Sequence, residues 1–489
     1  MIVLFQRAPR WRRIRKKRQN LKLCARTLTS EPAHTRNVTD SMCASNVMEL
    51  LPTSHVSSVK ESKAPQDLTW EPSPSNILHK NTLDGTVITA KKSINTDALK
   101  AGLSQHPDKD FVDRVVEYSV KGVPIFYEGP RLRRISPNWP SAYKYSDSVV
   151  ASISKNIAQG RMAGPFPSPP FKNFVGSPMG AFPKKRSDRK KIRVIHDLSW
   201  PPGSSVNDGI QDENCHVQYM TVDDVVHQLH SLGRGALVAK LDLKDAFHHI
   251  CVRPEDWELL GSSFETTDLQ GNSTVQYFVS MVLPFGLRSS PKQFSEFAKA
   301  NKLIMLYNGA SYVDNYLDDY ITAGHPNSDE CATNLSIMLE TCNDVGFEIN
   351  PDKIEPPTTM IEFLGIIMDT VKWELRISEQ RLTDILMELE QWLGRKKATK
   401  RELLSLIGKL SFISRVVRPG RTFIRRIINL SKKAKHLHHR LKLTKSCRSD
   451  IEWWLDYLPT WNGVGMFYEE NWICDYEMEM FMDARSVNL

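Results

Sequence analysis

Two adjacent carboxylates, Asp318 and Asp319, are the residues of this chain with the most direct chemical potential. They stand between short apolar runs, Tyr312-Val313 and Tyr320-Ile321, a pattern that predicts two strands with the acids at or beside the connecting turn. Two like charges are costly to bury side by side unless a positive group is held there. A divalent metal such as Mg²⁺, which prefers hard oxygen ligands, would supply that charge. A solvated turn is the alternative for an isolated acid pair.

A third carboxylate, Asp242, ends a strand that the sequence predicts over residues 236–241. An acid at a strand end is exposed at the edge of a sheet, which suits a metal ligand, although an ordinary strand-ending acid would look the same. Asp245 follows three residues later and is interpreted as a helix-start cap.

Three further loops have residue types that suit a binding site. Phe285 and Gly286 precede a helix start at Ser290, and a glycine there permits close approach of the backbone to a ligand. Residues 346–353 predict a helix end, a short strand and a turn bearing Lys353, and residues 361–366 predict a tight hairpin. A basic run over 184–191 predicts a hairpin tip between strands at 180–182 and 193–195.

Charge is concentrated in two parts of the chain. The net charge is +9, and residues 1–30 contain ten Lys/Arg and no acid. A second basic block, residues 394–448, contains eighteen Lys/Arg against the single acid Glu402. A solvated helical face normally interleaves acids with bases, so this excess favours a polyanionic partner such as nucleic acid.

Composition predicts an intracellular chain of several units. At 489 residues it exceeds one ordinary domain, and no apolar run approaches the roughly 20 residues that cross a membrane. The eight cysteines form no Cys-x-x-Cys pair, so neither a zinc ribbon nor a disulfide framework is indicated. Residues 1–95 predict a disordered basic leader, whose run at 10–18 suits a nuclear import signal, a nucleic-acid tether or an organelle transit peptide.

The order of these motifs resembles that of a reverse transcriptase over residues 160–430. The resemblance implies an α+β, right-hand polymerase fold with an antiparallel palm sheet and a helical thumb. The implied units are a helical extension over 96–160, fingers and palm over 161–375, and a basic thumb and connection over 376–475. Within the last of these, Thr399-x-x-Glu402 predicts a helix start by a capping box.

The resemblance also implies residue roles. Asp242, Asp318 and Asp319 would hold two Mg²⁺ ions, with Mn²⁺ as the alternative metal, and Lys353 would donate a proton to leaving pyrophosphate. Phe247 matches the steric gate that excludes a ribose 2′-hydroxyl. The remaining implied contacts are Lys184, Lys185 and Arg193 to the triphosphate, Phe285 and Gly286 to the nucleotide, and Phe363, Leu364 and Gly365 to the primer.

The exact residues of several motifs are similar to the polymerase region of DIRS-like retrotransposons, which pair this enzyme with a tyrosine recombinase. The stretches that carry this similarity are Gly164-Pro165-Phe166-Pro167, residues 196–208, Leu283-Pro284-Phe285-Gly286-Leu287, residues 106–111 and Gly129-Pro130-Arg131. Residues 476–489 resemble the start of a ribonuclease H domain, with Asp483 as its first acid, and we expect this domain to be truncated and inactive.

Three functions remain open at this point. The first is an RNA-directed DNA polymerase that takes dNTPs and a primed RNA or DNA template, with no membrane partner. The second is an inactive remnant of a retroelement that keeps only nucleic-acid binding. The third, an RNA-synthesising palm polymerase, is disfavoured by the aromatic ring at Phe247.

Overall fold

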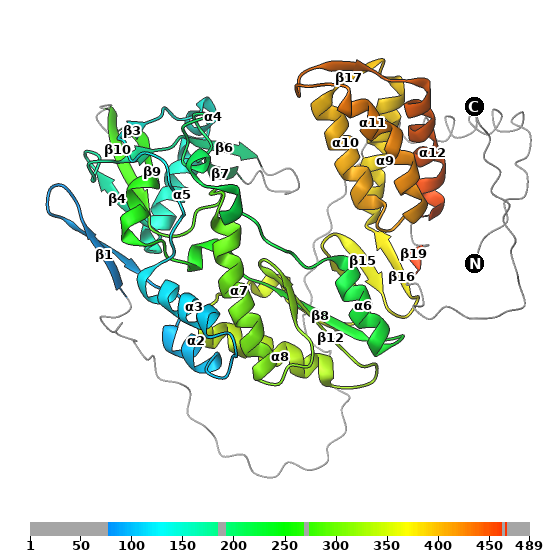
Figure 1. Ribbon diagram of the computed structural model, residues 1–489, viewed down its shortest axis with the longest axis horizontal. Coiled ribbons are helices and arrows are strands. Elements are labelled where there is room, and N and C mark those ends of the chain that lie inside the picture. The colour runs from blue at the N-terminus through cyan, green and yellow to red at the C-terminus, as the bar shows by residue number, and fades with distance from the viewer. Residues whose placement is uncertain (1–76, 184–191, 268–272, 462–464, 467–489) are drawn as a thin grey trace, which may run out of the picture. The chain divides into compact units, whose positions relative to one another are not determined.

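The computed structural model describes residues 77–183, 192–267, 273–461 and 465–466 (Figure 1). In these ranges, no helix is long and apolar enough to pass through a bilayer. The expected ribonuclease H start at 476–489 lies outside the described residues, as does the basic run at 184–191.

The first described elements are a hairpin and two helices. They are β1 (Ile77–Asn81), β2 (Val87–Lys91), α2 (Thr96–Gly102) and α3 (Lys109–Lys121). Leu78, Ile88 and Ala90 of the hairpin are buried in the core that also holds residues of the central helix α7 (Ser290–Tyr307). The prediction of a disordered leader through residue 95 is therefore wrong for residues 77–95, because this segment contributes apolar side chains to the main core.

The fingers consist of two helices, a mixed sheet and a hairpin. The helices are α4 (Pro140–Lys144) and α5 (Ser146–Ala158). The sheet has the order β3 (Arg134–Ile135), β5 (Val175–Gly176), β9 (Gly261–Thr267), β10 (Ser273–Ser280), β4 (Met162–Phe166). The predicted hairpin around the basic run is present as β6 (Met179–Pro183) and β7 (Ile192–His196). Ile153, Met179 and Phe264 contribute to a separate small core here.

The palm is a four-stranded antiparallel sheet. Its order is β11 (Asp314–Tyr316), β12 (Asp319–Gly324), β8 (Leu237–Asp242), β13 (Glu355–Thr358). Successive side chains alternate between its faces. Ala239 and Tyr320 pack with α7 and α8 (Glu330–Val345), whereas Val238 and Ile321 pack with α6 (Val222–Leu232). Figure 1 shows α8 running beside this sheet.

Short 3₁₀ turns link the fingers and palm elements. They are η3 (Asn207–Gly209), η4 (Asp212–Asn214), η5 (Ala246–His249), η6 (Pro254–Leu259) and η7 (Pro351–Lys353). Two of them, η5 and η7, follow directly on strands or loops that the sequence marked as site candidates.

A second antiparallel sheet joins the palm to the thumb. Its order is β14 (Met360–Phe363), β15 (Ile366–Asp369), β16 (Glu374–Ile377), β19 (Gly465–Met466). The thumb helices lie between β16 and β19 in the chain, and these two strands pair with each other. The chain therefore leaves and re-enters one sheet at neighbouring positions.

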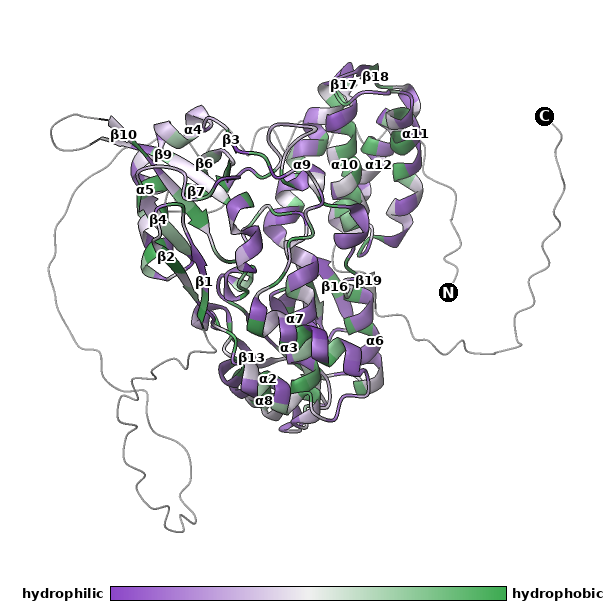
Figure 2. Ribbon diagram, turned by 60° about the vertical axis from the view of Figure 1, so that its left-hand side comes forward, coloured by the Kyte–Doolittle hydropathy of each residue, from purple (hydrophilic) through white to green (hydrophobic). Residues whose placement is uncertain are grey.

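The thumb is a helical bundle. It contains α9 (Glu379–Gly394), β17 (Lys397–Thr399), α10 (Lys400–Ile413), η8 (Arg418–Ile424), α11 (Arg425–Lys432), β18 (Arg440–Lys442) and α12 (Lys445–Trp461). The predicted capping box is confirmed, with Thr399 Oγ1 accepting from Glu402 N–H at 3.2 Å. Leu389, Leu406 and Trp454 are fully buried between the helices, which carry hydrophilic residues elsewhere on their surfaces (Figure 2).

Candidate active site

Strand pairing brings the three aspartates together at one end of the two central strands of the palm sheet, β12 and β8. In the β12–β8 ladder Asp319 lies directly opposite Asp242. Tyr316 pairs with Asp319, so Leu317 and Asp318 form a two-residue turn, and Leu317 has a φ of 54°. The N–H of Leu243 donates to the Asp318 carbonyl at 3.0 Å, which fastens the turn to the strand carrying Asp242. The predicted pair of strands with acids at their turn is therefore present.

The aspartates form a site with excess negative charge. Burial and the charge of Asp242 raise the pKa of Asp318, and burial, Asp318 and a hydrogen bond with Asp242 raise the pKa of Asp319 to about 7. Lys353 in η7 donates to Asp242 Oδ1 at 2.7 Å. Burial alone would lower the pKa of Lys353, but the hydrogen bond and charge of Asp242 outweigh it and raise the pKa. The site thus favours a cation beside its carboxylates.

Donor chemistry and charge fit a divalent ion at these carboxylates, because Mg²⁺ prefers hard oxygen ligands and three carboxylates face the single cation of Lys353. Among the described residues, however, no three His, Cys, Asp or Glu side chains already converge as a metal cage. Asp242, Asp318 and Asp319 are the residues that would hold such an ion, and this assignment remains a prediction.

Phe247, five residues after Asp242 in the chain, forms an aromatic pair with Phe285. Phe247, in η5, is half-buried, and its ring centroid lies 5.0 Å from that of Phe285 and 5.5 Å from that of Phe294. Phe285 is 42% exposed, so the pair has an accessible side. Gly286 has a φ of 100°, and a Cβ there would lie 3.1 Å from the His196 carbonyl. The loop therefore needs glycine both for its backbone angle and for its close packing.

Asn207 holds this loop in place, a role that sequence reasoning missed. Its Nδ2 donates to the Gly286 carbonyl at 2.9 Å and to Ser199 Oγ at 2.9 Å, while its Oδ1 accepts from the Arg288 N–H at 2.8 Å. The side-chain amide thus forms hydrogen bonds with the backbone on both sides of Leu287. The Val-Asn-Asp triplet was visible in the sequence, but its partner lies 79 residues away.

The predicted triphosphate contacts are only partly described. Arg193 lies in β7, opposite Phe182 of β6, and is exposed. Lys184 and Lys185 lie outside the described residues. All of these triphosphate contacts stay predictions.

The predicted primer hairpin is present between β14 and β15. Phe363 pairs with Ile366, which makes Leu364 and Gly365 a two-residue turn with φ of 49° and 78°. Positive φ at both central positions matches the twist of a tight hairpin. Phe363 is buried, and a Cβ on Gly365 would meet the Arg381 guanidinium at 2.5 Å. The turn shape is thus enforced, while its contact with a primer stays a prediction.

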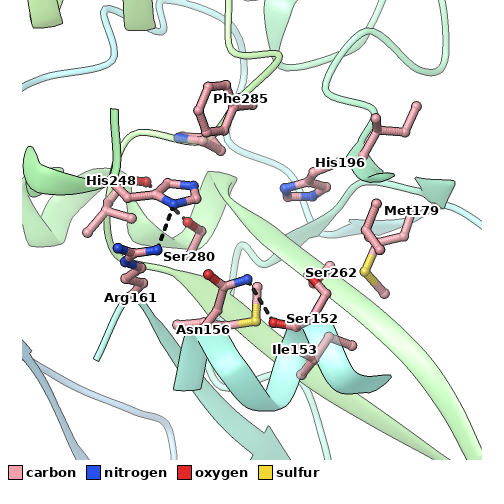
Figure 3. Close-up of a pocket in the computed structure, with 15 residues that line it drawn as sticks. Ser152, Ile153, Asn156, Arg161, Met179, His196, His248, Ser262, Ser280 and Phe285 are labelled. Carbon is pink, nitrogen blue, oxygen red and sulfur yellow. Dashed lines mark hydrogen bonds between the residues drawn. The ribbon is translucent and has the colours of Figure 1, made fainter. Parts of the chain in front are cut away.

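A cavity of about 140 Å³ is lined by Phe285 of the aromatic pair (Figure 3). Arg161, His196, His248 and Phe285 are among its lining residues. Arg161 forms an ion pair with Asp245, whose carboxylate makes no capping hydrogen bond to η5. Asp245 therefore occupies the predicted position just before η5, but its side chain does not cap that turn, because the carboxylate pairs with the Arg161 guanidinium instead.

Comparison with known proteins shows which family the sequence of this region matches. Residues 184–368 match the family described as reverse transcriptase (RNA-dependent DNA polymerase). The chain contains a reverse transcriptase domain. It is of the kind found in retroelement polyproteins, since the chain is 24% identical over 333 residues to the retrovirus-related Pol polyprotein from transposon opus of Drosophila melanogaster. It is also 23% identical over 246 residues to polyprotein P3 of Commelina yellow mottle virus.

These relatives are much longer than the matched region. The alignments cover 63% of this chain and 30% of the opus polyprotein, and 50% of this chain and 11% of polyprotein P3. The chain therefore corresponds to under a third of either relative.

Solved reverse transcriptases share the fold. A foamy viral protease-reverse transcriptase dRH, in complex with double-stranded DNA, aligns with a TM-score of 0.52 and 15% identity, covering 81% of this chain and 63% of that one. A second foamy viral protease-reverse transcriptase complex with double-stranded DNA gives a TM-score of 0.50 and 16% identity, over 75% and 72% of the two chains. The predicted right-hand polymerase fold is confirmed.

Proposed function

We propose that this reverse transcriptase domain makes the chain an RNA-directed DNA polymerase that extends a primer 3′-hydroxyl with dNTPs. The observation that carries the proposal is the register of the palm sheet, which places Asp319 opposite Asp242 with Asp318 in the adjoining turn. An aromatic pair with an accessible ring, Phe247 and Phe285, includes a residue only five positions after Asp242 in the chain. Carboxylates for metal and a shaped aromatic pocket together suit nucleotidyl transfer.

In the proposed reaction Asp242, Asp318 and Asp319 would hold two Mg²⁺ ions. Bound there, the metal supplies a lowered pKa for the primer hydroxyl and charge neutralisation for the phosphoryl group. Lys353 Nζ lies 2.7 Å from Asp242 Oδ1, and the raised pKa keeps this ammonium protonated, so it would be the proton donor to leaving pyrophosphate. Arg193, with Lys184 and Lys185, binds the triphosphate, and Phe247 excludes a 2′-hydroxyl by contact.

The proposed macromolecular partner is a primed RNA or DNA template. The foamy viral neighbours are complexes with double-stranded DNA, which supports the same class of partner here. The basic thumb would track phosphates, and the hairpin of Phe363, Leu364 and Gly365 would contact the primer. Binding should accordingly weaken steeply with salt.

At a finer level, we propose that the source element is DIRS-like and encodes a tyrosine recombinase beside this polymerase. The proposal is supported by the similarity of three stretches of sequence to that family, residues 164–167, 196–208 and 283–287. Sequencing of the genomic locus tests it: a tyrosine recombinase frame in the same element is expected, and an integrase frame in its place would contradict the proposal.

Primer extension on an RNA template tests the polymerase activity. Wild-type protein should extend the primer with dNTPs, and Asp318→Asn should lower the rate at least about a hundredfold, the several kcal/mol expected of a metal ligand. Asp352→Asn is the matched control, because Asp352 is an exposed acid next to Lys353 and should retain activity. Salt-sensitive template binding without any extension would instead indicate an inactive remnant.

A further inference from the structure

Arg161 is a largely enclosed arginine that no pattern in the sequence marks as functional. It lies between α5 and β4, and its side chain is 12% exposed. Its backbone is fixed on both sides: its N–H donates to the Asn156 carbonyl at 2.9 Å, and its carbonyl accepts from Met281 N–H at 2.9 Å. A guanidinium with a fixed base and little solvent has a defined direction, unlike a surface arginine.

That guanidinium contacts two residues of the turn that carries Phe247. Arg161 Nη1 donates to Asp245 Oδ2 at 2.7 Å. The same atom lies 3.3 Å from His248 Nδ1 (Figure 3). Burial and the arginine charge lower the pKa of His248 to about 4, so the imidazole is neutral near pH 7 and its Nδ1 can accept the N–H. Burial opposes ionisation of Asp245, but its hydrogen bond to Arg161 outweighs this and lowers its pKa.

The turn from Asp245 to His248 has a strained backbone and is closed by a hydrogen bond. Asp245 has a φ of 51°, an uncommon angle for a residue with a side chain, and the His248 N–H donates to the Asp245 carbonyl at 2.8 Å. Phe247 lies inside this loop. A strained turn persists only where surrounding contacts hold it, and Arg161 holds both its ends.

Arg161 also acts on the second aromatic ring, Phe285, through its contact with His248. The His248 ring packs edge-on against Phe285 with centroids 5.1 Å apart, and Phe285 packs on Phe247 at 5.0 Å. One guanidinium therefore fixes Phe247 through the chain and Phe285 through the imidazole.

We propose that Arg161 is a positioning residue for sugar selection, which clamps the Asp245–His248 turn so that Phe247 and Phe285 keep the spacing that admits a deoxyribose and excludes a ribose. The inference rests on the polymerase function proposed above. Arg161 acts through the aromatic rings and itself touches no nucleotide.

Single-nucleotide incorporation by Arg161→Met tests the clamp, because methionine keeps the apolar stem and removes both hydrogen bonds. The preference for dNTP over rNTP, as the ratio of kcat/KM values, should fall about tenfold, the loss expected for a charge-assisted pair. The KM for dNTP should rise more than kcat falls. Arg161→Lys should recover part of the preference, since an ammonium retains the ion pair with Asp245.

Lys155→Met is the matched control. Lys155 Nζ lies 3.9 Å from the same Asp245 carboxylate oxygen, but its side chain is 59% exposed. Removing it deletes a nearby positive charge without opening the clamp, so the nucleotide preference should match that of wild type. An equal loss of preference in Lys155→Met would overturn the clamp in favour of a general charge effect.

A double-mutant cycle with Phe247→Ala separates positioning from folding. If Arg161 acts through Phe247, adding Arg161→Met to Phe247→Ala should change the preference less than twofold, whereas independent effects would multiply. A lowered melting temperature with unchanged preference in Arg161→Met would show a purely structural residue and overturn the inference alone. Wild-type protein that incorporates no nucleotide would overturn the polymerase proposal, and the selection role with it.

Discussion

Two half-buried histidines that line the cavity beside Phe285 should make the stability of the protein fall in mild acid. Burial lowers the pKa of both His196 and His248 to about 4. The 3.0 Å contact of His196 Nε2 with the Gly261 carbonyl favours the protonated ring, but burial outweighs it, whereas for His248 the charge of Arg161, 3.3 Å from Nδ1, acts in the same direction as burial. In the unfolded chain the same side chains protonate near pH 6.5.

The sign follows from proton uptake. Between pH 6.5 and 4 the unfolded state binds these protons and the folded state does not, so stability present above pH 6.5 is lost as pH falls toward 4. From pH 7.5 to 5.5 a pKa of about 4 against about 6.5 costs roughly 1.3 kcal/mol per histidine, or about 2.6 kcal/mol for the two. That is a large part of the ~5–15 kcal/mol typical of a domain.

Urea unfolding at both pH values measures this loss. His196→Gln keeps an N–H donor near the Nε2 position and His248→Asn keeps an acceptor near Nδ1, so the double variant should remain folded. Its drop in unfolding free energy between the two pH values should be about 2.6 kcal/mol smaller than that of wild type. His438→Gln, at an exposed histidine, should keep the wild-type drop. An unchanged drop in the double variant would refute the reasoning.

Three further changes have distinct expected results. Phe247→Ala should lower the preference for dNTP over rNTP at least about tenfold in single-nucleotide incorporation, and an unchanged ratio would contradict the gate. Asn207→Ala removes the hydrogen bonds to Gly286 and Arg288, each worth about 1 kcal/mol, so steady-state kinetics should show the KM for dNTP about tenfold higher with a smaller change in kcat. Trp454→Ala should destabilise the thumb by about 3–5 kcal/mol in calorimetry, because its ring is fully buried against Gly420; a loss below 1 kcal/mol would contradict that packing.

Local patterns in the sequence were sufficient for the strands and turns of the site. Short apolar runs on either side of Asp318 and Asp319 predicted the hairpin, and the strand ending at Asp242 was placed correctly. The register that sets Asp242 opposite Asp319 could not be predicted from either strand alone, because many pairings satisfy the same alternation. Only the resemblance to a family joined the two.

The misjudged leader boundary had a signal that went unused. Asp84-Gly85 is a typical hairpin turn, and the strands on either side bury alternate residues such as Leu78, Ile88 and Ala90. Polar composition over the preceding residues outweighed this short pattern. Composition averages over long windows and therefore hides a hairpin of fifteen residues (Ile77–Lys91).

The positioning residues were beyond sequence reasoning for a different reason. Arg161 meets Asp245 across 84 positions, and Asn207 meets Gly286 across 79. No local period or motif marks such contacts, because they form only when the fingers and palm elements pack. A polar side chain that is fully hydrogen-bonded in the interior looks, in sequence, like any surface residue.

The pairing of β16 with β19 constrains how the thumb can move. A domain joined by one linker can swivel in any direction, but this bundle is tethered at both ends to adjacent strands, through Glu374 opposite Met466 and Leu375 opposite Gly465. Twisting about the long axis of the bundle would shear those two strands apart, whereas bending about their shared axis keeps their hydrogen bonds. The double tether therefore resists twisting of the bundle against this sheet more than it resists bending.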